Sequence, residues 1–107
     1  MTLMRIRNDH GVTLIDIEGH ADYNPGNDIV CAAISTLSYA MINYFQRMYD
    51  NGELEEFEAV DNPGDFHIRL KKDSEYYVQY RCGMDFFVDG MAMVAESYPD
   101  NLEIEDE

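Results

Sequence analysis

The fold is decided by one stretch in which the spacing of apolar residues changes, residues 12–41: VTLIDIEGHADYNPGNDIVCAAISTLSYAM. Its first part, Val12–Glu18, alternates apolar and polar side chains near its end, which is typical of a strand with one buried face. Beyond the loop signal Asn-Pro-Gly-Asn, apolar residues recur every three or four positions, which predicts a helix with Asp28 as its N-cap. The apolar positions expected along this helix are Ile29, Ala33, Leu37, Ala40, Met41, Tyr44 and Met48.

Strand signals flank this stretch on both sides. Residues 2–8 alternate partially, and the turn Asn-Asp-His-Gly joins them to residues 12–18, which predicts a β-hairpin. After Asn51-Gly52 ends the helix, residues 53–60 and 65–71 form a second pair of strands around the turn Asp-Asn-Pro-Gly.

A second helix follows the second pair of strands. Its start is open, because residues 76–80 also fit a strand, and Pro99 ends it. Residues 102–104 can add a short terminal strand. Consecutive hairpins then predict an α+β domain of order ββαββα, two layers with a mostly antiparallel sheet and both helices on one face. The second helix places its apolar positions at Tyr77, Tyr80, Met84, Phe87, Met91, Val94 and Tyr98.

Length and composition agree with one folded domain over residues 1–107. The 107 residues are 46% hydrophobic and include only three Pro, so the chain can build a core without disulfides or metals. No apolar run approaches the roughly 20 residues that a bilayer span needs, and the N-terminus lacks the apolar block of a signal peptide. We therefore expect no membrane association and a cytoplasmic protein.

The charge is strongly negative. Seven Lys and Arg against 22 Asp and Glu give a net charge of −15. This charge disfavours direct nucleic-acid binding, because contacts with phosphate groups need clustered Lys and Arg side chains. The acids gather in residues 50–65 and 100–107. Two interpretations stay open: a solvated edge with a frayed tail, or an acidic rim that attracts a lysine-bearing partner.

The candidate chemistry lies between the first two strands and the first helix. Cys31 falls in the first helical turn, where backbone N–H groups and the helix dipole favour a thiolate. His20, at the end of a strand, can reach across the loop to the sulfur, and a Cys–His pair is the minimal unit of nucleophile and base. Free N–H groups near the helix start could hold an oxyanion.

Structural interpretations of the same residues stand beside this one. Cys31 can be a small buried residue and His20 a surface residue. Asp28 can be only a cap, and its carboxylate can occupy an N–H group that an oxyanion needs. Gly26 can serve only a tight loop, and Ser35, one turn after Cys31, can be a neutral neighbour.

The remaining Cys and His residues give weaker signals. His67 alternates onto the face opposite Phe66 and Ile68, and a structural or surface role is favoured for it. Cys82 is expected to be a passive thiol, and neither cysteine to form a disulfide. We expect no cofactor and no metal, because a zinc set of His20, Cys31, His67 and Cys82 lacks the short spacing of structural sites.

A longer motif surrounds the Cys–His pair. Gly19-His20-Ala21 is followed after a short loop by Gly26-x-Asp-Ile-Val-Cys-Ala-Ala-x-Ser35, which resembles the signature of the ribosomal-processing cysteine protease family Prp. Residues 64–69 (Gly-Asp-Phe-His-Ile-Arg) and 95–99 (Ala-Glu-Ser-Tyr-Pro) also fit the family pattern, so the resemblance covers nearly the whole chain. The loop within the motif contains a Pro that the family pattern does not require. This modest departure concerns the contacts of the loop with substrate.

The resemblance implies a cysteine endopeptidase and a homodimer. Family members remove an N-terminal extension, with aromatic residues beside the cut and lysines beyond it, from the large-subunit ribosomal protein L twenty-seven. Related phage proteins process capsid-assembly proteins, so a phage-type protease is one alternative. The alternative that is not an enzyme is an acidic adaptor that binds ribosomal proteins without cleaving them. Carried over to this chain, the catalytic residues are His20 and Cys31, and the supporting ones Asp28, Ser35, Gly19, Gly26 and Ala32.

Overall fold

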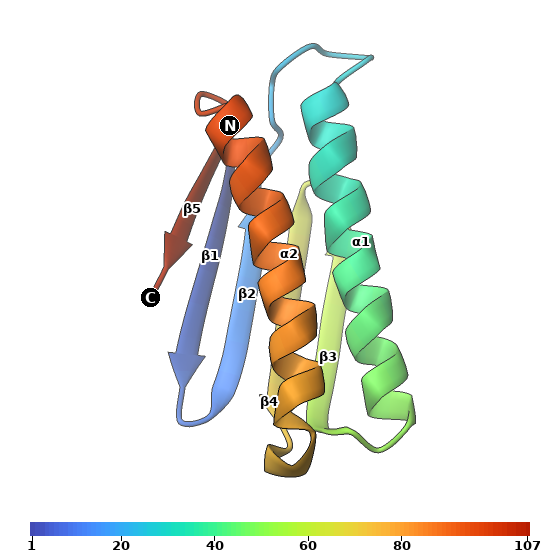
Figure 1. The fold of residues 1–107 in the computed structure, drawn as a ribbon. Coiled ribbons are helices and arrows are strands. Elements are labelled where there is room, and N and C mark those ends of the chain that lie inside the picture. The colour runs from blue at the N-terminus through green and yellow to red at the C-terminus, as the bar shows by residue number, and fades with distance from the viewer.

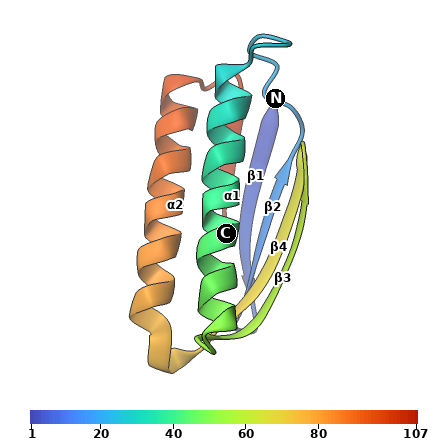
Figure 2. The same ribbon diagram turned by 90° about the vertical axis from the view of Figure 1, so that its right-hand side faces the viewer.

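A five-stranded sheet carries two long helices in the computed structural model, which describes residues 1–107 (Figure 1). Both helices lie on the same face of the sheet, and the opposite face is left uncovered (Figure 2). The predicted α+β architecture is confirmed. The elements are β1 (Thr2–Asp9), β2 (Val12–Glu18), α1 (Ile29–Asp50), β3 (Leu54–Asn62), β4 (Asp65–Lys72), a 3-10 turn (Ser74–Tyr76), α2 (Tyr77–Ser97) and β5 (Leu102–Asp106).

The strand order in the sheet is β3-β4-β2-β1-β5. The two predicted hairpins pair antiparallel, and they join each other through β2 and β4, with Glu18 opposite Asp65. The terminal strand β5 exists and pairs parallel to β1 after the chain returns through α2. Most of the acids after Asp100 therefore belong to a strand, and the frayed tail considered above is wrong.

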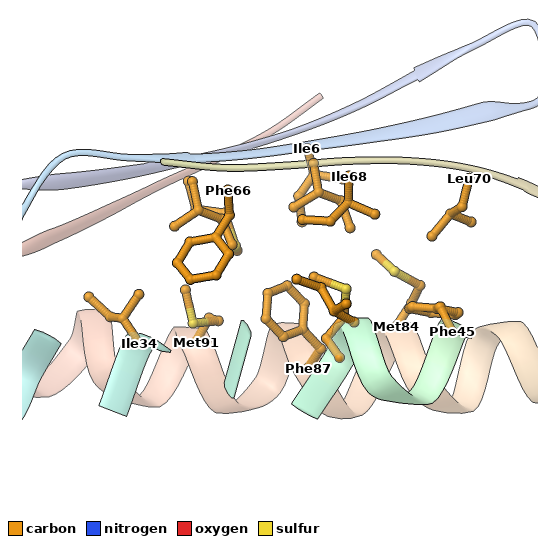
Figure 3. Close-up of a cluster of buried hydrophobic side chains, with 14 of the residues drawn as sticks. Ile6, Ile34, Phe45, Phe66, Ile68, Leu70, Met84, Phe87 and Met91 are labelled. Atoms are coloured by element: carbon orange, nitrogen blue, oxygen red, sulfur yellow. The ribbon is translucent and has the colours of Figure 1, made fainter. Parts of the chain in front are cut away.

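The core fills the space between the helices and the sheet (Figure 3). On α2 the expected positions Tyr80, Met84, Phe87 and Met91 are buried, whereas Tyr77 is largely exposed. The open question about the start of α2 is answered by the 3-10 turn, which Asp73 caps through a hydrogen bond from the Glu75 N–H.

The prediction for the apolar side of α1 is only partly confirmed. Ile29 is 58% exposed, and only Met41 and Met48 of the expected set are buried. The apolar residues of α1 occupy two adjacent sides: one faces the sheet, and the other, with Leu37 and Tyr44, lies against Gly90 and Gly83 of α2. The side that faces the sheet consists of Val30, Ile34, Ser38, Met41, Ile42, Phe45 and Met48.

By length and composition alone, α1 could cross a membrane, contrary to the expectation from the sequence that no segment is apolar enough to do so. In the folded domain its apolar side covers the sheet instead, as in the core helix of a globular protein.

Candidate active site

His20 and Cys31 come from the two elements that meet at one end of the sheet. β2 ends at Glu18, and Gly19 turns the chain with φ +96°. A side chain at Gly19 would lie 2.6 Å from the Met1 carbonyl oxygen, so only glycine fits. The Gly19 N–H donates to the Gly64 carbonyl in the β3–β4 turn at 2.9 Å, which fixes the start of the His20 segment. Cys31 is the third residue of α1 and is partly buried.

Asp28 is the N-cap of α1, as predicted, and it also fastens the loop before the helix. Its Oδ1 accepts from the Cys31 N–H at 2.8 Å, and its Oδ2 accepts from the N–H groups of Tyr23 at 2.9 Å and Asn24 at 3.3 Å. The hydrogen bond from Cys31 is the main cause that lowers the pKa of Asp28, although burial opposes it. The Cys31 N–H is therefore occupied by the Asp28 carboxylate, so it is not among the free N–H groups that could hold an oxyanion in this structure.

A small cavity brings Cys31 together with three of the residues around it. Cys31, Ser35 and Gly19 all line this cavity, and so does Gly64. The ring of His20 lies against the same Gly64, although His20 itself does not line the cavity. No hydrogen bond joins His20 to Cys31.

Three of the supporting residues do not line this cavity: Asp28, Gly26 and Ala32. Gly26, with φ +93°, forms the loop turn in which the Asn27 N–H donates to the Asn24 carbonyl at 3.2 Å. Nothing lies within 4 Å of where its Cβ would be, so its role in this structure is the turn itself. Ala32 is exposed on α1.

Gly64 is a site residue that sequence reasoning did not select. The residues 64–69 contributed to the family resemblance, but Gly64 itself read only as part of a turn. The register that pairs Glu18 with Asp65 brings Gly64 beside Gly19 and His20. The sequence Asp-Asn-Pro-Gly does indicate a turn at Gly64. To place this turn beside His20, however, one has to know that β2 pairs with β4.

His67 lies on the face of the sheet opposite to that of its buried neighbours Phe66 and Ile68, as predicted. Its Nδ1 lies 2.7 Å from Asp16 Oδ1 and its Nε2 lies 2.6 Å from Asp65 Oδ1, while Arg7 donates to the other oxygen of Asp16. With Asp16 and Glu18, His67 forms the only group of three or more His, Cys, Asp or Glu side chains that lie close enough together to share a metal ion. The alternative zinc set with His20, Cys31 and Cys82 is thus not assembled, and Cys82 is exposed on α2.

The contacts of His67 and Asp16 shift both titrations in the directions expected for an ion pair. The hydrogen bond with Asp16 raises the pKa of His67 above its usual value, burial opposes this, and Asp65 adds to it. Burial would raise the pKa of Asp16, but hydrogen bonds with His67 and Arg7 outweigh it and hold that pKa below its usual value.

We expect this pair to stabilise the fold most near pH 5. The contribution of His67 is complete below about pH 6.5, its unfolded pKa, and is lost as pH rises through the higher folded value. The contribution of Asp16 is complete above about pH 3.9 and is lost as pH falls through the lower folded value. Urea unfolding of wild type and His67→Asn should give a stability difference that is largest near pH 5 and shrinks towards pH 9. A difference that stays constant with pH would contradict this assignment.

The arrangement at Cys31 can be compared with known proteins. The family model described as cysteine protease Prp matches residues 1–103. The chain belongs to this family. The chain is 39% identical over 64 residues to the ribosomal processing cysteine protease Prp of Staphylococcus aureus, in strains Mu50 and NCTC 8325, and the match spans 58% of this chain and 58% of those relatives.

Solved structures of Prp show the same fold. The S. aureus protease with a covalently linked product peptide has a TM-score of 0.74 at 22% identity, with both chains fully covered. Its complex with a substrate peptide has a TM-score of 0.71 at 18% identity, again over both chains in full. SMU.848 from Streptococcus mutans has a TM-score of 0.64 at 22% identity, covering 99% of this chain and 93% of that one.

Proposed function

We propose that this chain is a cysteine endopeptidase that processes a ribosomal protein, with Cys31 as nucleophile and His20 as general base and acid. The observation that carries the proposal is that Cys31 and Gly64 line one cavity and that the His20 ring lies against the same Gly64, within the motif of a cysteine protease family. The S. aureus relative is named as a ribosomal processing protease, which supports the substrate class.

The chemistry follows from the two groups. His20 takes the proton of the Cys31 thiol, and the thiolate attacks the scissile carbonyl carbon. The protonated His20 then gives its proton to the leaving amine, which leaves a thioester on Cys31. Water, deprotonated by His20, hydrolyses the thioester, releases the carboxylic acid and restores the thiol. Asp28 holds the first turn that carries Cys31, and Ser35 lines the cavity beside the sulfur.

We propose as substrate the N-terminal extension of ribosomal protein L twenty-seven, with lysines beyond the cut. Exposed carboxylates surround the pair in support of this: Glu18 and Asp22 lie on either side of Gly19-His20, and Asp61 and Asp65 flank the turn at Gly64. Such a rim attracts ammonium groups and weakens as salt screens it. We place the reaction in the cytoplasm, where both free cysteines stay reduced.

Incubation with candidate precursors tests the function. The protein is mixed with extended ribosomal protein L twenty-seven and with a phage capsid-assembly precursor, and new N-termini are read by mass spectrometry. Cleavage of the ribosomal precursor alone supports the proposal, and salt should then raise the apparent KM for a lysine-bearing peptide more than for a neutral one. Tight binding of the precursor with no cleavage would favour the adaptor alternative, and cleavage of the phage precursor alone the phage-type protease.

We also propose that the chain forms a homodimer through the outer side of its helices. A groove of about 380 Å³ lies between α1 and α2, and its lining is mostly apolar. Phe86 borders this groove, and 79% of its surface is exposed to solvent, which is a large exposed apolar area for a single side chain. A second copy of this face would bury it, and a self-complementary patch is what a twofold dimer uses.

Phe86→Ser should shift the protein from dimer to monomer without loss of fold, because Phe86 is exposed within the single chain. Sedimentation velocity measures the mass of each species over a range of concentrations. The matched control is Val78→Ser, an exposed apolar residue of the same helix that does not line the groove. A wild-type protein that sediments as a monomer at all concentrations would overturn the dimer.

A further inference from the structure

We propose that Gly64 is a positioning residue for His20: its missing side chain leaves the space in which the imidazole lies, against a residue of the cavity that Cys31 lines. The inference rests on the proposed function, because it concerns the general base of that reaction. It goes beyond the motif, which contributes residues from the His20 loop and from α1, by assigning a role to the tip of the β3–β4 hairpin.

Gly64 lies close to the edge of the His20 ring that carries both nitrogens. A Cβ at Gly64 would lie 2.7 Å from Cε1, 3.0 Å from Nε2 and 3.2 Å from Nδ1 of His20. Carbon atoms separated by van der Waals contact lie about 3.5–4.0 Å apart, so a methyl group here must displace the ring. Both imidazole nitrogens lie at this surface, and a displaced ring carries them away from the positions used for proton transfer.

The hairpin tip is attached to both parts of the candidate pair. On the His20 side, the Gly64 carbonyl accepts from the Gly19 N–H at 2.9 Å, one residue before the histidine. On the Cys31 side, Tyr39 of α1 packs its ring edge-on against Phe66, with centroids 5.2 Å apart. Gly64 and Phe66 also line the same cavity as Cys31. Figure 1 shows this tip at the end of the sheet where α1 begins.

These attachments make the tip a spacer between the base and the nucleophile. His20 itself is exposed and lies in a loop, so the loop alone leaves its ring free to choose among rotamers. The backbone of Gly64 supplies a fixed wall on one side of that ring. A misplacement of about 1 Å in a reacting group can lower the rate about 100-fold, so such a wall has a large effect on catalysis.

The chain contains a matched control for this glycine. Gly11 lies in the other hairpin turn with φ +82°, close to the φ of +75° at Gly64, and nothing lies within 4 Å of where its Cβ would be. Alanine at either position therefore meets the same unfavourable backbone conformation, but only alanine at Gly64 meets His20.

The experiment compares Gly64→Ala and Gly11→Ala in the full chain. We expect similar melting temperatures for the two variants, with kcat for an extended ribosomal peptide about 100-fold lower in Gly64→Ala and close to wild type in Gly11→Ala. The chemical shift of the His20 Cε1 proton, measured by NMR, should change in Gly64→Ala only, because the added methyl group displaces the ring. This second measurement needs no substrate, and a loss of fold alone would not reproduce it.

The two measurements separate this inference from the proposed function. If the wild type cleaves and Gly64→Ala cleaves as well as Gly11→Ala, with an unchanged chemical shift of the His20 Cε1 proton, the role of Gly64 is overturned and the protease remains. If the wild type cleaves nothing, the proposed function fails, and the NMR comparison still decides whether Gly64 positions the imidazole.

Discussion

Replacing Cys31 with alanine should abolish cleavage, with a loss of about 10⁴-fold or more, as expected when the nucleophile of a protease is removed. The cavity offers only Ser35 as another hydroxyl or thiol on α1, one helical turn further on, and an unactivated hydroxyl is a poor nucleophile. The fold should survive, because Cys31 is only partly buried and alanine suits a helix. Mass spectrometry of the peptide products measures the cleavage, and circular dichroism the fold.

The second cysteine gives the matched control. Cys82 is exposed on α2 and lies outside the cavity of Cys31, so Cys82→Ala should cleave at the wild-type rate. Iodoacetamide should label Cys31 in preference to Cys82 at pH values well below about 8.5, where an ordinary thiol stays protonated. Undiminished cleavage by Cys31→Ala would end the assignment of the nucleophile.

The local features of the fold follow from the sequence, because they depend on neighbouring residues. The turn between Asn8 and Gly11, the Asp28 cap and the helical period of α2 each involve residues within a few positions, and the structure confirms them. Side chains such as Met84 and Met91 repeat at helical spacing along the buried side of α2, so their burial could also be predicted.

The predictions that depended on distant partners were incomplete. Leu37 and Tyr44 recur along α1 at the same helical spacing as its buried residues. Which of the two sides faces the sheet is decided by the position of α2, whose glycines at 83 and 90 receive Tyr44 and Leu37. For the candidate site the same limit applies. The pair His20 and Cys31 lies within one motif, whereas the contact of His20 with Gly64 depends on β2 pairing with β4.

His20→Ala should lower kcat at neutral pH by about 10²–10⁴-fold, the usual contribution of a positioned acid and base. The loss has two parts. Without His20 no group delivers a proton to the leaving amine, and the Cys31 thiol has to ionise without a neighbouring base. The second part depends on pH, because an unassisted thiol ionises near about pH 8.5. The remaining rate of His20→Ala should therefore increase between pH 7 and pH 9, and its ratio to the wild-type rate should increase with it.

The appropriate control is His10→Ala, since His10 is exposed in the β1–β2 turn at the opposite end of those strands from His20. Rates of peptide cleavage over this pH range should match wild type for this variant. A His20→Ala loss that is small and independent of pH would show that His20 only shapes the loop. A large loss that high pH partly restores is specific to a base, because a structural role gives no reason for the thiol's ionisation to limit the rate. The pH dependence therefore separates the two interpretations of His20 that the sequence left open, which the size of the loss alone cannot do.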